Sequence, residues 1–132
     1  MSFFSEKSRI LPVLLSMGVI FFVSHQPGDA IKLIDVPNID KLLHCLVYAV
    51  LAYTALFAVS PAIRRSKSKI VGCFVVLFCL LYGISDEFHQ YFVPGRFPSK
   101  WDVSADTLGA VLAVVSWFKY VEPRLQTANR QL

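Results

Sequence analysis

The sequence has few charged residues, and its cysteines and basic residues form no motif that would define a function. Charged side chains make up 17% of the 132 residues, against about a quarter in a typical soluble domain. The three cysteines, Cys45, Cys73 and Cys79, lie inside apolar segments at spacings that match no thiol motif, so we interpret them as packing residues. The basic residues form no glycine-rich or aromatic-interleaved tract, which argues against a nucleic-acid partner.

Hydrophobic residues are abundant instead, and they arrive in long blocks rather than in alternation. They make up 55% of the chain, and the mean hydropathy is +0.56. Since a membrane span needs about 20 apolar residues, four blocks predict membrane-spanning helices near residues 8–24, 42–60, 70–92 and 103–121. We therefore expect an all-α integral membrane bundle of four helices, in a single domain that occupies residues 1–132.

The first block is short and allows a second interpretation. Pro12 lies near its start, where proline is tolerated, and the side chains of Lys7 and Arg9 can extend toward the membrane surface. A charged start, an apolar run and a following turn are also typical of a signal peptide. Residues 28–30 make a poor cleavage site, so we favour an uncleaved first helix.

Lysine and arginine segregate to one side of the predicted bundle. The loop at residues 61–69 holds four basic residues and no acid, which places it in the cytoplasm by the positive-inside rule. Both termini then lie in the cytoplasm. That side receives nine basic and two acidic residues, whereas the outer face receives four basic and seven acidic residues. In the outer loop, apolar spacing between residues 30 and 34 predicts a short interfacial helix.

Residues 85–110 combine four carboxylates with His89, Gln90, Arg96 and Lys100, and they lie between two apolar segments. Several of these polar side chains must lie at or below the membrane surface, because the preceding apolar run is too short to cross a bilayer without them. Ionisable groups at that depth are costly and indicate a functional site by default. We therefore expect a polar site at the outer end of the bundle, built from the second, third and fourth helices.

Asp40, His44 and Tyr48 follow one another at intervals of four residues and so share one face of the second helix. Asp40 occupies the position expected of an N-cap, so capping is the alternative to a role in the site. His44 lies one turn below the membrane surface and needs a partner there. That partner is either a hydrogen-bonding group of the bundle or a group of the functional site.

Asp86, Glu87 and Gln90 lie near the carboxyl end of the third helix, where the helix dipole disfavours anions. Two adjacent carboxylates in such a place need a cation, a proton or a strong hydrogen-bond donor. The available partners are Arg96, Lys100, His44, His89 and a metal ion. The alternative to a functional site is an ion-paired belt that locks the helices together.

Asp102 and Asp106 are four residues apart in the first turns of the fourth helix, where the dipole favours anions. Asp102 is explained equally well as an N-cap, whereas Asp106 lies one turn deeper and is not. Below it, a stripe of small residues (Ala105, Gly109 and Ala113) allows a close approach between helices. We expect that approach to bring Asp106 near the third helix.

These residues form an ordered pattern over residues 24–113: Asp40-Lys41-x-x-His44-x-x-x-Tyr48, Asp86-Glu87-x-x-Gln90-x-x-x-Pro94-Gly95-Arg96 and Asp102-x-x-x-Asp106-x-x-Gly109. The combination resembles the VanZ-like family. The resemblance implies a small multi-helix protein of the bacterial inner membrane. The family takes its name from a component associated with resistance to teicoplanin, a drug that binds cell-wall precursors, and the resemblance brings no biochemical activity with it.

The first functional hypothesis is an enzyme that acts at the outer membrane surface on a phosphorylated lipid or a lipid-linked cell-wall intermediate. The expected catalytic residues are His44, as general acid or base, with Glu87 and Asp106. Clustered oxygen ligands suit Mg²⁺ or Ca²⁺, and the expected metal ligands are Asp86, Glu87, Asp102 and Asp106. The expected substrate-binding residues are Asp40, Tyr48, Gln90 and Arg96, of which Arg96 would take phosphate charge.

Two other classes of function are alternatives. A binding or envelope-modulating protein without turnover would use the same carboxylates and Arg96 to recognise a lipid head group or a drug. A proton-coupled transporter would use intramembrane carboxylates as a relay, although the four short helices show no inverted repeat. The sequence also lacks the arginine- and histidine-bearing motifs of the common membrane phosphatases, which argues against an enzyme of that kind.

Overall fold

The computed structural model describes residues 6–28 and 38–130, and these residues form helices and loops without a strand. The all-α fold class is therefore confirmed. The elements are η1 (Glu6–Ile10, a 3₁₀ helix), α1 (Leu11–Ser24), α2 (Ile39–Ala58), α3 (Pro61–Ser66), α4 (Ser68–Gln90), α5 (Lys100–Ser116), η3 (Trp117–Val121, a π-helix) and α6 (Glu122–Arg130).

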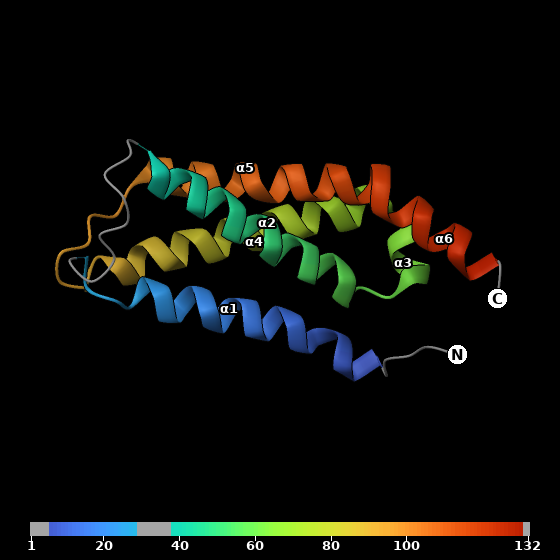
Figure 1. Ribbon diagram of the computed structural model, residues 1–132, viewed down its shortest axis with the longest axis horizontal. Coiled ribbons are helices and arrows are strands. Elements are labelled where there is room, and N and C mark those ends of the chain that lie inside the picture. The colour runs from blue at the N-terminus through green and yellow to red at the C-terminus, as the bar shows by residue number, and fades with distance from the viewer. Residues whose placement is uncertain (1–5, 29–37, 131–132) are drawn as a thin grey trace.

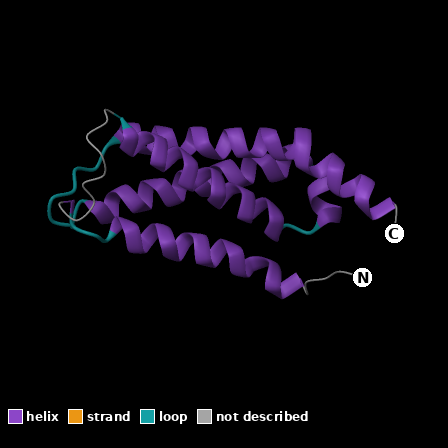
Figure 2. Cartoon of the chain, in the orientation of Figure 1, coloured by secondary structure: helices purple, strands orange, loops and turns teal. Residues whose placement is uncertain are grey.

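Four of these helices, α1, α2, α4 and α5, run alongside one another as an elongated bundle (Figure 1). At one end, which we call the loop end, α1 and α4 finish and α2 and α5 begin. At the other end, which we call the α6 end, α1 begins and the short helices α3 and α6 lie (Figure 1). Figure 2 shows the same arrangement, with the helices in purple and the described loops in teal.

The helix boundaries differ from the predicted ones at several ends. The helix α2 begins at Ile39 rather than at residue 42, directly after Asn38, whose φ of 62° lies in the left-handed region. The helix α5 begins at Lys100, because the Ser99 side chain accepts a hydrogen bond from the backbone N–H of Trp101 and so caps it. The short helix α3 lies within the predicted cytoplasmic loop and was not expected. It starts with Pro61, a residue well suited to a first helical turn.

Two helices are long and apolar enough to cross a membrane, α2 with a mean hydropathy of 1.6 and α4 with 2.0. The first apolar helix, Ser8–Ser24, is shorter. Large apolar side chains point outward from the bundle, among them Leu15, Phe74 and Phe88, each more than 65% exposed. Such a surface is typical of helices in contact with lipid or with another protein. The predicted interfacial helix at residues 30–34 falls outside the described residues.

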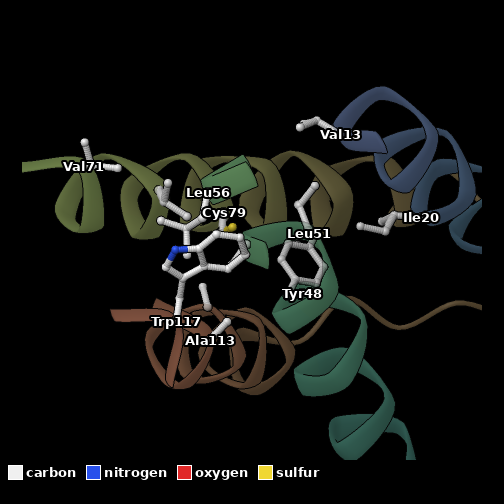
Figure 3. Close-up of a cluster of buried hydrophobic side chains, with 12 residues drawn as sticks. Val13, Ile20, Tyr48, Leu51, Leu56, Val71, Cys79, Ala113 and Trp117 are labelled. Atoms are coloured by element: carbon white, nitrogen blue, oxygen red, sulfur yellow. The ribbon is translucent and has the colours of Figure 1, made fainter. Parts of the chain in front are cut away.

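The core lies at the centre of the bundle and joins all four long helices (Figure 3). Leu51 and Leu56 of α2 and Cys79 of α4 are fully buried, and Trp117 packs against them from the far end of α5. Cys79 therefore packs as predicted, whereas Cys73 is exposed on the surface of α4.

Two glycines determine how closely the helices approach one another. A Cβ atom at Gly109 would collide with the backbone carbonyl of Cys45, so α5 packs directly against the backbone of α2. The small-residue stripe therefore faces the second predicted helix, not the third. Gly83 of α4 provides the space for Asp106, because a Cβ atom there would lie 2.8 Å from Asp106 Oδ2. Asp106 thus does lie near α4, but a glycine of α4 makes this possible.

Candidate functional site

The loop end brings His44 of α2 and Asp106 of α5 together. His44 Nδ1 and Asp106 Oδ1 lie 2.9 Å apart, and the Asp106 side chain is fully buried. When Asp106 is ionised its carboxylate can only accept, and it then holds the imidazole with a proton on Nδ1 and leaves Nε2 for another partner. The close packing of α5 on α2 at Gly109 fixes the distance between the two side chains. This pair gives His44 the partner that the sequence required.

Glu87, near the carboxyl end of α4, lies in the same region. It is buried, with 6% of its surface exposed, and its Oε2 accepts a hydrogen bond of 2.7 Å from the backbone N–H of Ser99. Its other oxygen, Oε1, is buried and has no hydrogen-bond partner among the described residues, and the same holds for Asp106 Oδ2. A buried polar atom without a partner costs about 1–3 kcal/mol. The site therefore holds more acceptors than the surrounding protein satisfies.

His44, Glu87 and Asp102 could together hold a metal ion. Each offers one ligand atom, and these atoms lie within 4.8 Å of one another. One imidazole nitrogen and two carboxylate oxygens form a ligand set that suits Mn²⁺ or Zn²⁺, because imidazole is a poor ligand for the harder Mg²⁺ and Ca²⁺ of the sequence-based expectation. Asp106 would then orient His44 from behind, as carboxylates commonly do for metal-bound histidines.

We expected Asp86 to be a further metal ligand. In the structure, it lies on the side of α4 that faces α1. Its Oδ2 accepts hydrogen bonds from Ser24 Oγ at 2.9 Å and from Gln90 Nε2 at 3.2 Å. Gln90 Nε2 also lies 3.4 Å from Ser24 Oγ. Adjacent residues of a helix point about 100° apart, so Asp86 and Glu87 serve two different regions of the bundle.

Lys41 belongs to the site, although it was not predicted as a site residue from the sequence. Its Nζ lies 2.8 Å from Asp40 Oδ2 and 3.1 Å from Asp102 Oδ1 and so bridges α2 and α5. The N-cap interpretations of Asp40 and Asp102 are wrong, because both residues lie in the first turn inside their helices. The lysine could have been found from its position, since it follows Asp40 directly at the predicted outer surface.

Tyr48 lies one helical turn below His44 on α2, as its spacing predicts. It is 1% exposed, and its hydroxyl group has no hydrogen-bond partner among the described residues. A buried tyrosine usually finds such a partner. Together with Glu87 Oε1 and Asp106 Oδ2, this hydroxyl makes a third buried polar atom left unpaired at this end of the molecule.

Arg96 is placed differently from the expected position over the carboxylates. Its Nε donates to the Gln26 carbonyl at 3.1 Å, and its Nη2 donates to the Val23 carbonyl at 2.9 Å. The guanidinium group therefore binds one carbonyl in the last turn of α1 and one just beyond the end of that helix, where a cation also complements the helix dipole. Within the described part of the chain, no hydrogen bond joins Arg96 to a carboxylate.

A second buried charge cluster lies at the α6 end and was not predicted. Arg64 Nε lies 2.6 Å from Glu122 Oε2, and the same oxygen accepts a hydrogen bond of 3.0 Å from Trp117 Nε1. Burial alone would raise the pKa of Glu122, but the hydrogen bonds from Arg64 and Trp117 outweigh it and hold the pKa below its ordinary value. The sequence offered a signal, since Glu122 is one of two acidic residues on the basic side.

The fold and the site define a helical bundle with two helices able to span a membrane and a buried acidic site at one end. A model of the VanZ/LLP1 family matches residues 9–121, and the chain belongs to this family. This confirms the resemblance seen in the sequence and makes the chain a VanZ-like protein, linked through its family to resistance. No curated protein and no solved structure matches the chain.

Proposed function

We propose that this VanZ-like protein binds a divalent cation between His44, Glu87 and Asp102 and, through it, the phosphate of a lipid-linked cell-envelope precursor. The observation that carries the proposal is the convergence of three ligand atoms within 4.8 Å of one another, beside a buried Glu87 Oε1 without a partner. A cation coordinated by Glu87 would relieve this unsatisfied charge, which is otherwise costly. The proposed cation is Mn²⁺ or Zn²⁺.

The charges around the site favour a cation as the bridge to a phosphate group. Glu87, Asp102 and Asp106 would repel an anion directly. The nearby basic groups are already engaged, because Lys41 pairs with Asp40 and Asp102, and Arg96 binds the carbonyls of α1. A bound divalent ion reverses the local charge and supplies a ligand position for phosphate oxygens.

The position of the site favours a lipid-linked ligand. The site lies where α2 begins and α4 ends, and both helices are long enough to span a membrane. If they do so, the site lies at the depth of the lipid head groups. We propose that this is the outer, periplasmic face of the bacterial inner membrane, because the basic residues concentrate toward the other end. A ligand of this kind would also connect the protein to teicoplanin resistance, since that drug binds cell-wall precursors.

In an enzyme, the cation would polarise a phosphoryl oxygen and activate a bound water molecule. Asp106 would hold His44 in its ligand tautomer, and Ser99 would fix Glu87 through its backbone N–H. The alternative is a binding protein without turnover. The ion pair of Lys41 with Asp102, at 3.1 Å, favours it, because Lys41 would supply cationic charge at the site where an enzyme needs the metal ion on that carboxylate.

The test is native mass spectrometry of the detergent-purified protein with added Mn²⁺ or Zn²⁺, with and without a chelator. We expect one bound ion per chain, lost in the Glu87→Gln variant and retained in the Asp40→Asn variant, whose carboxylate lies outside the three-residue group. Polyprenyl phosphate should then bind only with the ion present. An equal ion content in the wild type and the Glu87→Gln variant would overturn the proposed site. Ion-independent binding of polyprenyl phosphate would overturn the bridging role.

A further inference from the structure

A separate groove lies between α1 and α4 near the loop end of the bundle. It has a volume of about 350 Å³, at the lower end of the range for ligand sites. Its lining includes four aromatic side chains, one carboxylate and one imidazole: Phe21, Tyr82, Phe88, Phe92, Asp86 and His89. The proposed cation site uses Glu87 on another side of α4, so the groove is not part of that site.

The carboxylate of Asp86 has one oxygen available in this groove. Its Oδ2 accepts the hydrogen bonds from Ser24 and Gln90, whereas its Oδ1 accepts none from the described residues. His89 Nε2 lies 3.1 Å from His25 Nδ1 and pairs with that ring, and among the described residues no hydrogen bond joins His89 to Asp86. The side chain is 6% exposed, so a further donor or a cation at Oδ1 would offset more of the desolvation of this carboxylate.

The remaining chemistry of the groove fits an organic cation. No lysine or arginine is among the residues that line it. The nearest such side chain on the adjoining loop, Arg96, binds the carbonyls of Val23 and Gln26. The faces of phenylalanine and tyrosine rings attract ammonium groups, and a nearby carboxylate adds direct charge attraction. Rings on several sides and one carboxylate form a typical recognition site for an ammonium group.

We propose that this groove binds the ammonium head group of a zwitterionic phospholipid such as phosphatidylethanolamine. The ligand is a lipid rather than a soluble amine, because most of the residues that line the groove belong to α4, a candidate membrane span with a mean hydropathy of 2.0. Two exposed apolar side chains of the same helix, Leu81 and Ile84, directly precede the lining residues Tyr82 and Ser85 in sequence, and Phe88 of the lining is itself exposed. Acyl chains can pack on these side chains while the ammonium group reaches Asp86.

The test compares lipids that differ only in the amine. The full-length protein is placed in nanodiscs that contain phosphatidylethanolamine, its N-acetylated derivative or phosphatidylglycerol, and its thermal unfolding is measured. We expect phosphatidylethanolamine to raise the midpoint by about 3 °C or more over the other two lipids. Native mass spectrometry should show roughly tenfold stronger retention of phosphatidylethanolamine than of the N-acetylated lipid. Equal midpoints and equal retention for these two lipids would overturn the proposal.

Two variants locate the effect in the groove. Asp86→Asn should abolish the preference for the amine, but it also changes the contact with Ser24 and can weaken the fold. Phe88→Leu avoids this problem, because the ring is 69% exposed, and it should reduce the preference severalfold. Phe74→Leu is its matched control, an equally exposed phenylalanine of the same helix outside the groove. Equal behaviour of the two leucine variants would overturn the assignment to the groove, and the same stabilisation by soluble phosphoethanolamine would overturn the assignment to a lipid.

Discussion

The two buried charge clusters, one at each end of the bundle, differ in how completely their polar atoms are paired. At the α6 end, Arg64 and Glu122 form an ion pair with 3% and 5% of their surfaces exposed. Arg64 Nη1 also donates to the carbonyls of Leu56 at 2.8 Å and Val59 at 3.0 Å, and Trp117 donates to Glu122. The charged groups of Arg64 and Glu122 and the indole N–H of Trp117 all have hydrogen-bond partners in this cluster.

At the loop end, some buried polar atoms have no hydrogen-bond partner. Glu87 Oε1, Asp106 Oδ2 and the Tyr48 hydroxyl are buried and unpaired within the described residues. A satisfied buried network stabilises one arrangement of helices, whereas a partly satisfied network lowers stability. A protein tolerates the second kind where a ligand completes it. The comparison therefore indicates a structural role for the Arg64–Glu122 cluster and supports the binding role that we propose for the loop end.

The largest expected effect tests the structural role. Arg64→Met would leave Glu122 charged and buried without its main partner, so we expect a loss of roughly 3–5 kcal/mol in the free energy of unfolding. Arg65→Met is the control, since Arg65 lies 3.5 Å from Glu122 but its side chain is 41% exposed. It should cost about 1 kcal/mol or less. Denaturation in detergent, followed by circular dichroism, measures both variants, and equal losses would contradict the assigned role of Arg64.

The next effect concerns the contact that holds the loop-end site together. In Gly109→Ala, the added methyl group would collide with the carbonyl of Cys45, and α5 would have to move away from α2. We expect a loss of about 1–3 kcal/mol and weaker binding of Mn²⁺ or Zn²⁺, because His44 and Asp106 would separate. Gly18→Ala is the control, because a Cβ atom at Gly18 has no neighbour within 4 Å. It should stabilise the protein by about 0.5–1 kcal/mol.

A glutamate-to-glutamine substitution at each end tests the difference between the two ends directly. Glu122→Gln should cost about 1–3 kcal/mol, because Arg64 loses its counter-ion. Glu87→Gln should leave the unfolding midpoint unchanged or raise it, since it removes a buried charge with an unpaired oxygen and keeps an oxygen for the Ser99 N–H. It should nevertheless abolish binding of the divalent ion. If both variants lost stability equally in thermal unfolding, the loop-end carboxylates would be structural as well.

The pattern of apolar blocks was sufficient to predict the four long helices, and the position of the polar residues along the chain was sufficient to predict that they gather at one end of the bundle. The need of His44 for a partner was visible in the sequence, and its partner is Asp106. The direction of neighbouring side chains was not predictable, because a shift in helix rotation decides whether Asp86 or Glu87 faces α5. Arg64 was treated as a loop charge, since its burial depends on the unexpected helix α3.

The hydrogen-bond partners of Arg96 could not be predicted from the sequence either. A guanidinium group beside four carboxylates favours an ion pair when spacing alone is considered. In the structure, the last carbonyls of α1 compete for it, and the turn at Gly95, with a φ of 74°, directs it toward them. The position of Arg96 therefore depends on contacts with residues far away in the sequence, and a local sequence pattern does not predict such contacts.

The smallest expected effect is the contribution of Glu122, at the α6 end, to the pH dependence of stability. Because the pKa of Glu122 is lower in the folded protein than its ordinary value of 4.5, the folded state favours the ionised form. This stabilisation is fully present above pH 4.5 and is lost as the pH falls through the lower, folded-state pKa. The thermal midpoint of the wild type should therefore approach that of Glu122→Gln as the pH is lowered from about 6 to about 3. A difference in midpoint that stays constant over this range would mean that the ion pair does not stabilise the ionised carboxylate, and the contrast between the two ends would then rest on packing around Trp117 rather than on charge.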